Sequence, residues 1–358
     1  MTTLTWYIAP IAIHPWETLL EALEHIWMSQ ADFATRTGLA KETINRIISW
    51  TSSISHESAI KFENVLSISA DFWMNYQNRY DRDVARIQEE ERLAEEAKMI
   101  CDFKNYDILV KTWYVKETSV VTERTQEILK FLWVSSFLFL DKIYPALHRK
   151  STNAKVNFLN LALWKRLGER ESEKITLKEL DLKWLKKRIP EMRELTLIDI
   201  TSACEKLIQI CSDHGVALVY THYFANTYTN WAVRYTRDKK ILIQIAPRFQ
   251  KADNFWFTFF HELWHVFLHQ RKLDFTDIEN MDENEEEKEA DKFACDTLIP
   301  SKYLNKLEDL KKNIYSKTFK KEIAQFAVKI GIHSWIIAWR IANETWNWGK
   351  LNSLRVKV

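Results

Sequence analysis

The chain has 358 residues, of which 46% are hydrophobic and 28% charged, and its formal net charge is +2. This balance excludes a chain that stays disordered in solution, and the length favours two or three compact domains. The overall charge says little about partners, but residues 1–81 carry five Lys or Arg against nine Asp or Glu, a local net charge of −4.

The cysteine pattern indicates a reducing compartment. Four cysteines are too few and too widely spaced for a disulfide framework in a chain of this size: Cys101, Cys204, Cys211 and Cys295. The first 30 residues lack a basic start followed by an apolar run and a cleavage site, and the longest apolar stretch, 128–140, is too short to span a bilayer. We therefore expect a cytoplasmic protein without a membrane segment.

The N-terminal region is predicted to be a bundle of short helices. With only 5 Gly and 6 Pro in the chain, helix is favoured throughout, and the apolar spacing between His14 and Tyr80 predicts five short helices. Ser29 is the expected cap of the helix QADFATRT, and Gly38, which can adopt positive φ, joins that helix to AKETINRIIS. These two helices are predicted to form a helix-turn-helix.

A helix-turn-helix inserts the start of its second helix into the major groove of DNA. Base or phosphate contacts are therefore expected from Lys41, Glu42, Thr43 and Arg46, and phosphate contacts from Gln30 and Thr35. The segments SQADFATRTGLAKETINRII and SADFWMNYQNRYD resemble the Cro/repressor-type helix-turn-helix of HigA-type antitoxins, over about residues 12–81. The resemblance implies an operator-binding homodimer and a toxin partner.

Two features favour an alternative role for this module, a helical bundle used for dimerisation or protein contact. Phosphate neutralisation drives most DNA binding, whereas this module is net acidic. Ser49 and Trp50 stand where relatives usually end the recognition helix with Asn-Gly.

The pattern of charged and apolar residues changes twice after this module. The charged stretch RDVARIQEEERLAEEAK predicts a solvated connector helix, with a domain boundary after residue 81, and residues 100–200 predict further helices that serve as scaffold. After Asp199, GVALVY, WAVRYT and ILIQIA predict a small sheet. WAVRYT is either an edge strand that pairs with an extended substrate or an ordinary core strand. Helices follow, including two around Gly331 near the C-terminus.

The segment HELWH carries the residues that predict a metal site. His261 and His265 are four residues apart, so on a helix they project from nearly one face and can bind one ion, for which zinc is suited. Glu262 lies about 100° further around the helix, where its carboxylate can reach a water on the ion and act as general base. In a chain with 10 His, accidental matches to this pattern number on the order of 0.02, which disfavours two core histidines that bind no metal.

A catalytic zinc needs a third protein ligand. His269 lies about 12 Å from His261 along the helix axis, too far to share the ion, so the ligand must come from a second helix. In EKEAD, Glu287 and Asp291 are four residues apart, so Glu287 can bind the metal while Asp291 orients the ring of His261. Glu289 is the alternative third ligand.

The stretches FWFTFFHELWHVFLH and EKEADKFACDTLIP resemble the ImmA/IrrE family of zinc metallopeptidases, from about Cys204 to the C-terminus. The resemblance implies that His261, His265 and Glu287 bind zinc and that Glu262 is the catalytic base. The helical middle also resembles the connector in chains that fuse HigA-type and ImmA/IrrE units. Trp264 departs from relatives, which usually carry Gly there, and we expect its ring to restrict the space beside the histidines.

We therefore predict an α+β, mostly helical protein: an N-terminal all-α helix-turn-helix bundle (1–81), a helical connector (82–200), and a small zincin-like domain with a short sheet and the HExxH helix (201–358). The predicted function is a regulatory zinc-dependent endopeptidase that cleaves a specific protein, a repressor or antitoxin by resemblance, and binds operator DNA. The alternative is a non-catalytic, HigA-like antitoxin or regulator that keeps zinc only for structure.

Overall fold

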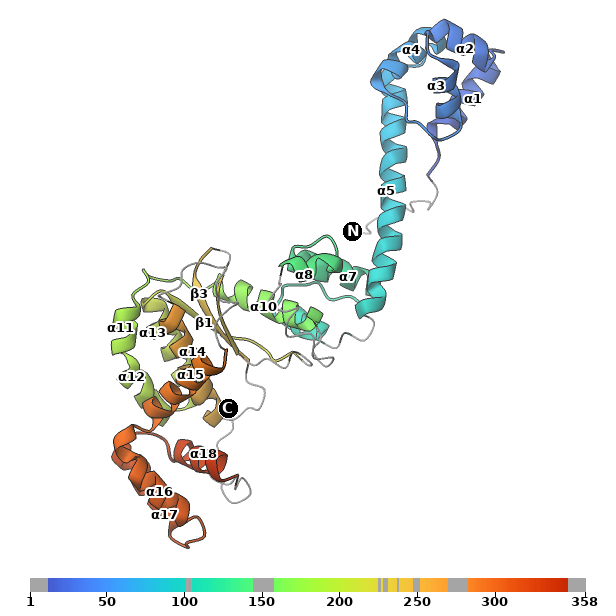
Figure 1. Ribbon diagram of the computed structural model, residues 1–358. Helices are drawn as coiled ribbons and strands as arrows, with labels where there is room; N and C mark the ends of the chain where they lie inside the picture. Colours follow the sequence, from blue (N-terminus) through green and yellow to red (C-terminus); the bar gives the residue numbers. More distant parts are fainter. Residues whose placement is uncertain are drawn as a thin grey trace, which may run out of the picture. The chain divides into compact units, whose positions relative to one another are not determined.

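The computed structural model describes residues 12–100, 103, 105–143, 158–224, 227, 231–236, 238–246, 252–269 and 283–346 (Figure 1). The chain divides into two compact units. The first comprises Met1–Asp102 with Thr118–Gln126, and the second Phe103–Glu117 with Glu127–Val358. Among the described residues, no helix combines the length and the apolar character needed to cross a membrane.

Four short helices open the first unit: α1 (Pro15–His25), α2 (Gln30–Thr37), α3 (Lys41–Ile48) and α4 (His56–Leu66). The Oγ of Ser29 accepts a hydrogen bond from the backbone N–H of Asp32 at 3.1 Å, and so caps α2. Gly38, with φ +66°, ends the same helix. Both features confirm the predicted turn. The core between the helices is built from Leu19, Leu23, Phe33, Ile44, Ile47 and Phe62.

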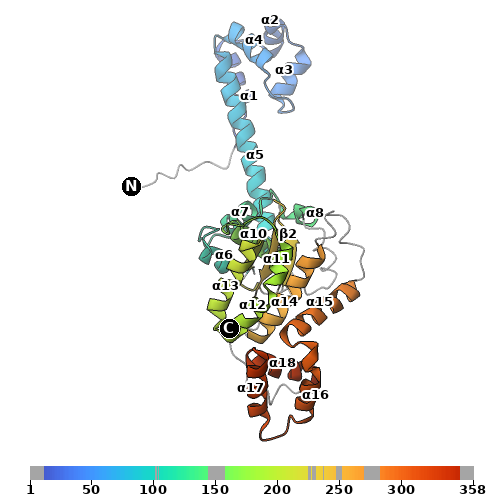
Figure 2. The same ribbon diagram turned by 90° about the vertical axis from the view of Figure 1, so that its left-hand side faces the viewer.

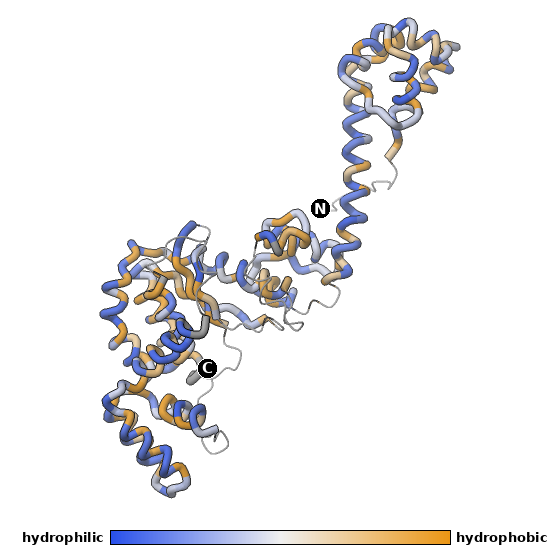
Figure 3. Tube along the Cα trace, viewed as in Figure 1, coloured by the Kyte–Doolittle hydropathy of each residue, from blue (hydrophilic) through white to orange (hydrophobic). Residues whose placement is uncertain are grey.

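A single long helix, α5 (Ala70–Ile100), follows these four in the first unit. The prediction of a separate connector helix starting at Arg82 is wrong, because neither Gly nor Pro interrupts this stretch and charged side chains one turn apart form ion pairs along it. Arg92, for example, pairs with Glu89 and Glu96. The second half of α5 is largely hydrophilic (Figure 3). The boundary predicted after residue 81 therefore falls inside a continuous helix.

The helices before the sheet are α6 (Tyr106–Lys111), α7 (Val121–Leu132), α8 (Leu140–Ile143), α10 (Phe158–Ser172), α11 (Leu182–Lys187), α12 (Ile189–Glu194) and α13 (Ile200–Asp213). α10 and α13 pack against the sheet. Gly168 of α10 faces Gln244 of the sheet so closely that a Cβ would collide with the side-chain amide. That amide donates to the carbonyl of Trp164 at 2.8 Å, which fixes α10 on the sheet.

The three predicted strands are confirmed, in the spatial order β1 (Val216–Tyr220), β3 (Ile241–Ile245), β2 (Trp231–Tyr235). β1 runs parallel to β3, whereas β2 runs antiparallel to it. All of β3 is buried, as expected for a central strand, and β2 is more exposed. The segment WAVRYT is therefore an edge strand.

The remaining helices are α14 (Ala252–His269), α15 (Glu283–Leu298), α16 (Leu304–Lys312), α17 (Phe319–Ile330) and α18 (Ser334–Thr345). α14 packs along α15 and against β2 and β3, whereas α16, α17 and α18 gather together (Figure 2). Gly331, at φ +69°, ends α17 as predicted. The predicted class, a mostly helical α+β protein with a small sheet, is confirmed.

Candidate metal centre

Helices α14 and α15 lie close together because the seam between them is apolar and partly lined by small side chains. Ala290 and Ala294 of α15 are completely buried, as are Leu263 and Val266 of α14. A side chain limited to Cβ lets two helix backbones approach closely, which brings the polar residues beside the seam within reach of one another. The position of Glu287, one turn before Ala290, follows from this packing.

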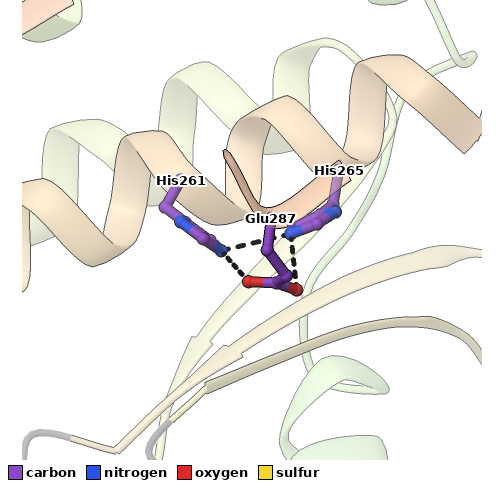
Figure 4. Close-up of side chains that lie close together, drawn as sticks. All are labelled: His261, His265 and Glu287. Carbon is purple, nitrogen blue, oxygen red and sulfur yellow. Dashed lines mark hydrogen bonds and ion pairs between the residues drawn. The ribbon is translucent and has the colours of Figure 1, made fainter. Parts of the chain in front are cut away.

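Three side chains converge beside the seam (Figure 4). The Nε2 atoms of His261 and His265 are 3.2 Å apart. Oε2 of Glu287 lies 3.1 Å from Nε2 of His261, and its Oε1 lies 3.5 Å from Nε2 of His265. Among the described residues, these three form the group of His, Cys, Asp or Glu side chains whose ligand atoms could hold one metal ion. The structure thus brings together the two histidines with Glu287 from the second helix.

The separations fit a tetrahedral zinc site. With zinc bonds of about 2.0–2.1 Å, the edges of a tetrahedron of ligand atoms measure about 3.3–3.4 Å, and the three observed distances lie between 3.1 and 3.5 Å. Two imidazole nitrogens and one carboxylate are also the donor set of many catalytic zinc sites, which keep a further position open. The side chain of Glu287 is 58% exposed, so the site reaches solvent on that side.

Asp291 fixes the ring of His261. Its Oδ1 lies 2.9 Å from Nδ1 of His261. Since a carboxylate accepts the hydrogen bond, Nδ1 carries the hydrogen and the lone pair of Nε2 is directed at the group shared with His265 and Glu287. This is the tautomer that binding a metal through Nε2 would need.

Glu262 lies next to the group without belonging to it. Glu262 is almost completely buried, with 3% of the residue exposed, and His261 is 5% exposed. Glu262 follows His261 on α14, so its side chain leaves the helix about 100° away from that histidine. It is not among the three residues whose ligand atoms converge. The structure therefore separates Glu262 from the three side chains that converge.

Aromatic rings surround His261, and sequence reasoning did not find them. The ring of Trp231, at the start of β2, approaches His261 edge-on with centroids 6.4 Å apart, and Phe257 lies at 6.1 Å. Phe257 also contacts Trp339 of α18, at 4.9 Å. The position of Phe257 one turn before His261 could have indicated its contact, but Trp231 requires knowledge that β2 is the strand beside α14.

Two further predicted features lie elsewhere. Glu289 lines a cavity with Lys186, Trp264 and Phe293, and none of the three converging residues lines that cavity. The prediction that Trp264 restricts the space beside the histidines is wrong, because its ring stacks on Phe293 with centroids 4.8 Å apart. Glu289 and Trp264 therefore belong to a different surface of the α14 and α15 pair.

The described cysteines are unsuited to nucleophilic catalysis. Burial raises the pKa of Cys211 to about 12 and that of Cys204 to about 11, and it also raises the pKa of Cys295. Their thiols therefore stay protonated at neutral pH, whereas the thiolate is the reactive form.

The residues predicted to contact DNA all lie on α2 and α3. Gln30 and Thr35 are exposed on α2, and Lys41, Glu42 and Arg46 are exposed on α3, with Thr43 half-buried. The opposite side of α3 buries Ile44 and Ile47 in the core. The polar side of α3 is therefore accessible, and its contact with DNA stays a prediction.

Residues 211–329 match a peptidase family described as the IrrE N-terminal-like domain. The N-terminal region is similar to three solved structures. An addiction module antidote protein of a HigA family from Coxiella burnetii is 26% identical, and the match covers 24% of this chain and 94% of that chain, with a TM-score of 0.23. A protein from Nostoc punctiforme described as an antidote protein of a plasmid maintenance system is 28% identical (23% of this chain, 91% of that chain, TM-score 0.23), and antitoxin GraA is 28% identical (24% of this chain, 91% of that chain, TM-score 0.22). The comparison with curated proteins finds no match. The chain therefore contains, at residues 211–329, a domain of the IrrE N-terminal-like family.

Proposed function

We propose that the IrrE-like domain is a zinc-dependent endopeptidase. The observation that carries the proposal is the convergence of His261, His265 and Glu287 at separations of 3.1–3.5 Å. The exposed side chain of Glu287 supports a catalytic rather than a closed structural site, because a substrate needs access to the metal.

The bound metal and each of the nearby side chains have separate chemical roles. Zinc, when bound, supplies a Lewis acid that polarises a peptide carbonyl and acidifies water. Glu262 accepts the proton of the attacking water and returns it to the nitrogen of the leaving amine. Asp291 keeps the hydrogen of His261 on Nδ1, so the ring stays in its metal-binding tautomer.

The substrate is proposed to be a specific protein of the repressor or antitoxin class. This part of the proposal rests on the family match and on the similarity of the N-terminal region to HigA-type antitoxins. The exposed polar side of α3 supports a second activity, operator binding that regulates transcription, for which a two-fold dimer is the usual arrangement. A toxin is the proposed further partner.

The decisive experiment uses Glu262→Gln, which removes the proton acceptor while it preserves side-chain size. Metal analysis of the purified variant should still find one zinc per chain. Cleavage of the natural substrate should fall by at least about 100-fold, the loss typical of removing a general base. The substrate is identified as the protein that is cleaved in cells expressing the wild type and intact in cells expressing the variant.

Glu289→Gln is the matched control, because it makes the same chemical change on an exposed residue outside the convergent group. It should leave both zinc content and cleavage unchanged. If zinc is present and Glu262→Gln cleaves as fast as the wild type, the peptidase assignment is wrong and the protein is a regulator that keeps zinc for structure.

A further inference from the structure

Tryptophan occupies a backbone conformation in this protein that normally requires glycine. Within the described part of the chain, seven residues other than glycine have positive φ, and five of them are Trp27, Trp50, Trp113, Trp133 and Trp346, with φ between 54° and 68°. Since the chain has 16 Trp among 358 residues, seven positions drawn at random would hold about 0.3 Trp. The excess therefore needs a cause.

These tryptophans share one structural position, one or two residues after the last residue of a helix. In four cases, the following residue donates its backbone N–H to the carbonyl five residues earlier: Met28 to Leu23, Thr51 to Arg46, Tyr114 to Leu109 and Val134 to Leu129. This bond defines the Schellman motif, whose left-handed residue is usually glycine. Ile332 makes the same bond to Ala327, and there the left-handed residue is Gly331.

Burial does not compensate for the strain at these positions. A residue with a Cβ is strained in the left-handed region, because Cβ comes too close to a backbone carbonyl oxygen. Trp27, Trp113 and Trp346 are 95%, 93% and 83% exposed. In contrast, the buried tryptophans Trp73 and Trp164 lie inside helices with ordinary negative φ. Trp50 and Trp133 are 62% and 61% exposed, and their rings contact Trp16 and Arg166. The five left-handed positions thus combine the backbone of glycine with tryptophans that lie largely at the surface.

The composition agrees with this pattern. Globular proteins contain about 7% glycine, which corresponds to about 25 residues in a chain of this length, whereas this chain has 5.

We propose that the cell of origin inserts glycine at positions 27, 50, 113, 133 and 346 because it reads the codon UGA as glycine. UGA means tryptophan in some genetic codes and glycine in others, so the meaning of one codon decides which residue stands at all five positions together. UGG, the ordinary tryptophan codon, would then encode the tryptophans buried inside helices.

The direct test is to sequence both the gene and the protein. The five codons should be UGA, and peptide mass spectrometry of the protein isolated from its own cells should find glycine at all five positions. The codons for Trp73 and Trp164 should be UGG, with tryptophan in the corresponding peptides. UGG codons at the five positions, or peptides that contain tryptophan there, would overturn the proposal.

A second test addresses the physical premise in the full-length recombinant chain. Trp113→Gly should slow amide hydrogen exchange in the last turn of α6 by about 5-fold, because glycine relieves about 1 kcal/mol of left-handed strain. Trp184 is the matched control, since it is 53% exposed but lies inside α11. Trp184→Gly should speed exchange in α11 by a similar factor, because glycine destabilises a helix interior. Faster exchange in α6 for Trp113→Gly would overturn the premise.

Discussion

His261 is held through both of its ring nitrogens, one directed at Asp291 and the other at the group shared with His265 and Glu287. Each contact depends on the other, because the hydrogen on Nδ1 determines that Nε2 offers a lone pair. The two carboxylates of α15 therefore contact different nitrogens of His261, although their side chains are equally exposed, at 58%.

Replacing the carboxylate that belongs to the convergent group should release the metal. Glu287→Ala leaves two histidines as protein ligands, so zinc affinity should fall by more than about 100-fold, measured by competition with a chelating indicator. Glu289→Ala, two residues further along α15, is the control and should bind zinc like the wild type, because Glu289 lines a separate cavity. If Glu289→Ala loses zinc and Glu287→Ala binds it like the wild type, Glu289 is the ligand.

Asp291→Asn should weaken the site without abolishing it. The amide is uncharged and can present its NH₂ group to Nδ1, which favours the wrong tautomer of His261, so zinc affinity should fall by about 10- to 100-fold. Competition with the same chelating indicator measures this affinity. Asp296→Asn is the control, because it makes the same change on the same helix, at a residue that lines the separate cavity. It should leave zinc affinity unchanged. Equal zinc affinity in the two variants would contradict the orienting role of Asp291.

At the scale of elements, the C-terminal ends of two helices meet at one arginine. The guanidinium of Arg193, on α12, donates to the carbonyl of Leu298, the last residue of α15, at 3.1 Å and 3.2 Å. It also donates to the carbonyl of Ile330, the last residue of α17, at 2.7 Å. A positive charge at helix C-termini satisfies carbonyls that have no partner within their own helix.

Arg193→Ala should therefore destabilise the second unit by about 2 kcal/mol, since hydrogen bonds to charged groups contribute about 1.5–3 kcal/mol and the carbonyls lose their donor. Thermal unfolding of the full chain measures the change. Arg188→Ala, at the residue just before α12, is the control, because Arg188 forms an exposed pair with Glu191, and such pairs contribute little. Equal shifts in melting temperature for both variants would refute the capping role.

At the scale of the whole molecule, one chain joins a compact helix-turn-helix unit to a unit that contains the IrrE-like domain. The polar side of α3 carries Lys41 and Arg46 beside Glu42, in a region whose net charge is −4. DNA binding by such a unit has to rely on a few local cations, so it should be weak and strongly dependent on salt.

If the first unit binds operator DNA, Arg46→Ala should weaken binding and reduce the slope of log affinity against log salt by about 1, as expected when one phosphate contact is lost. Fluorescence anisotropy with DNA from upstream of the gene, over a series of salt concentrations, measures both quantities. Arg79→Ala is the control, because Arg79 is an exposed arginine on α5, outside the helix-turn-helix. An unchanged slope in Arg46→Ala would leave dimerisation or protein contact as the role of α3.

Much of the fold follows from local rules that a sequence displays directly. Ser29 and Gly38 mark the ends of α2 because capping and left-handed φ depend on a few neighbouring residues. His261 and His265 share a helix face because the helical repeat places them there. The three strands are visible as short apolar runs. The sequence did not predict the length of α5. Ion pairs one turn apart continue this helix through the charged stretch after residue 81, where the sequence pattern indicated a domain boundary.

Only the tertiary structure decided what depends on contacts between distant segments. Glu287 and Glu289 are both acidic residues of α15, and the packing of α15 on α14 selects Glu287 because its side of the helix faces the histidines. The approach of Trp231 to His261 depends on strand order, and the placement of Trp264 against Phe293 depends on the helix pair. The sequence by itself determined most of the elements and the pairing of the two histidines on one helix face, since both depend on spacing along the chain. The approach of Glu287 and Asp291 to the histidines and the aromatic surroundings depend on how those elements pack.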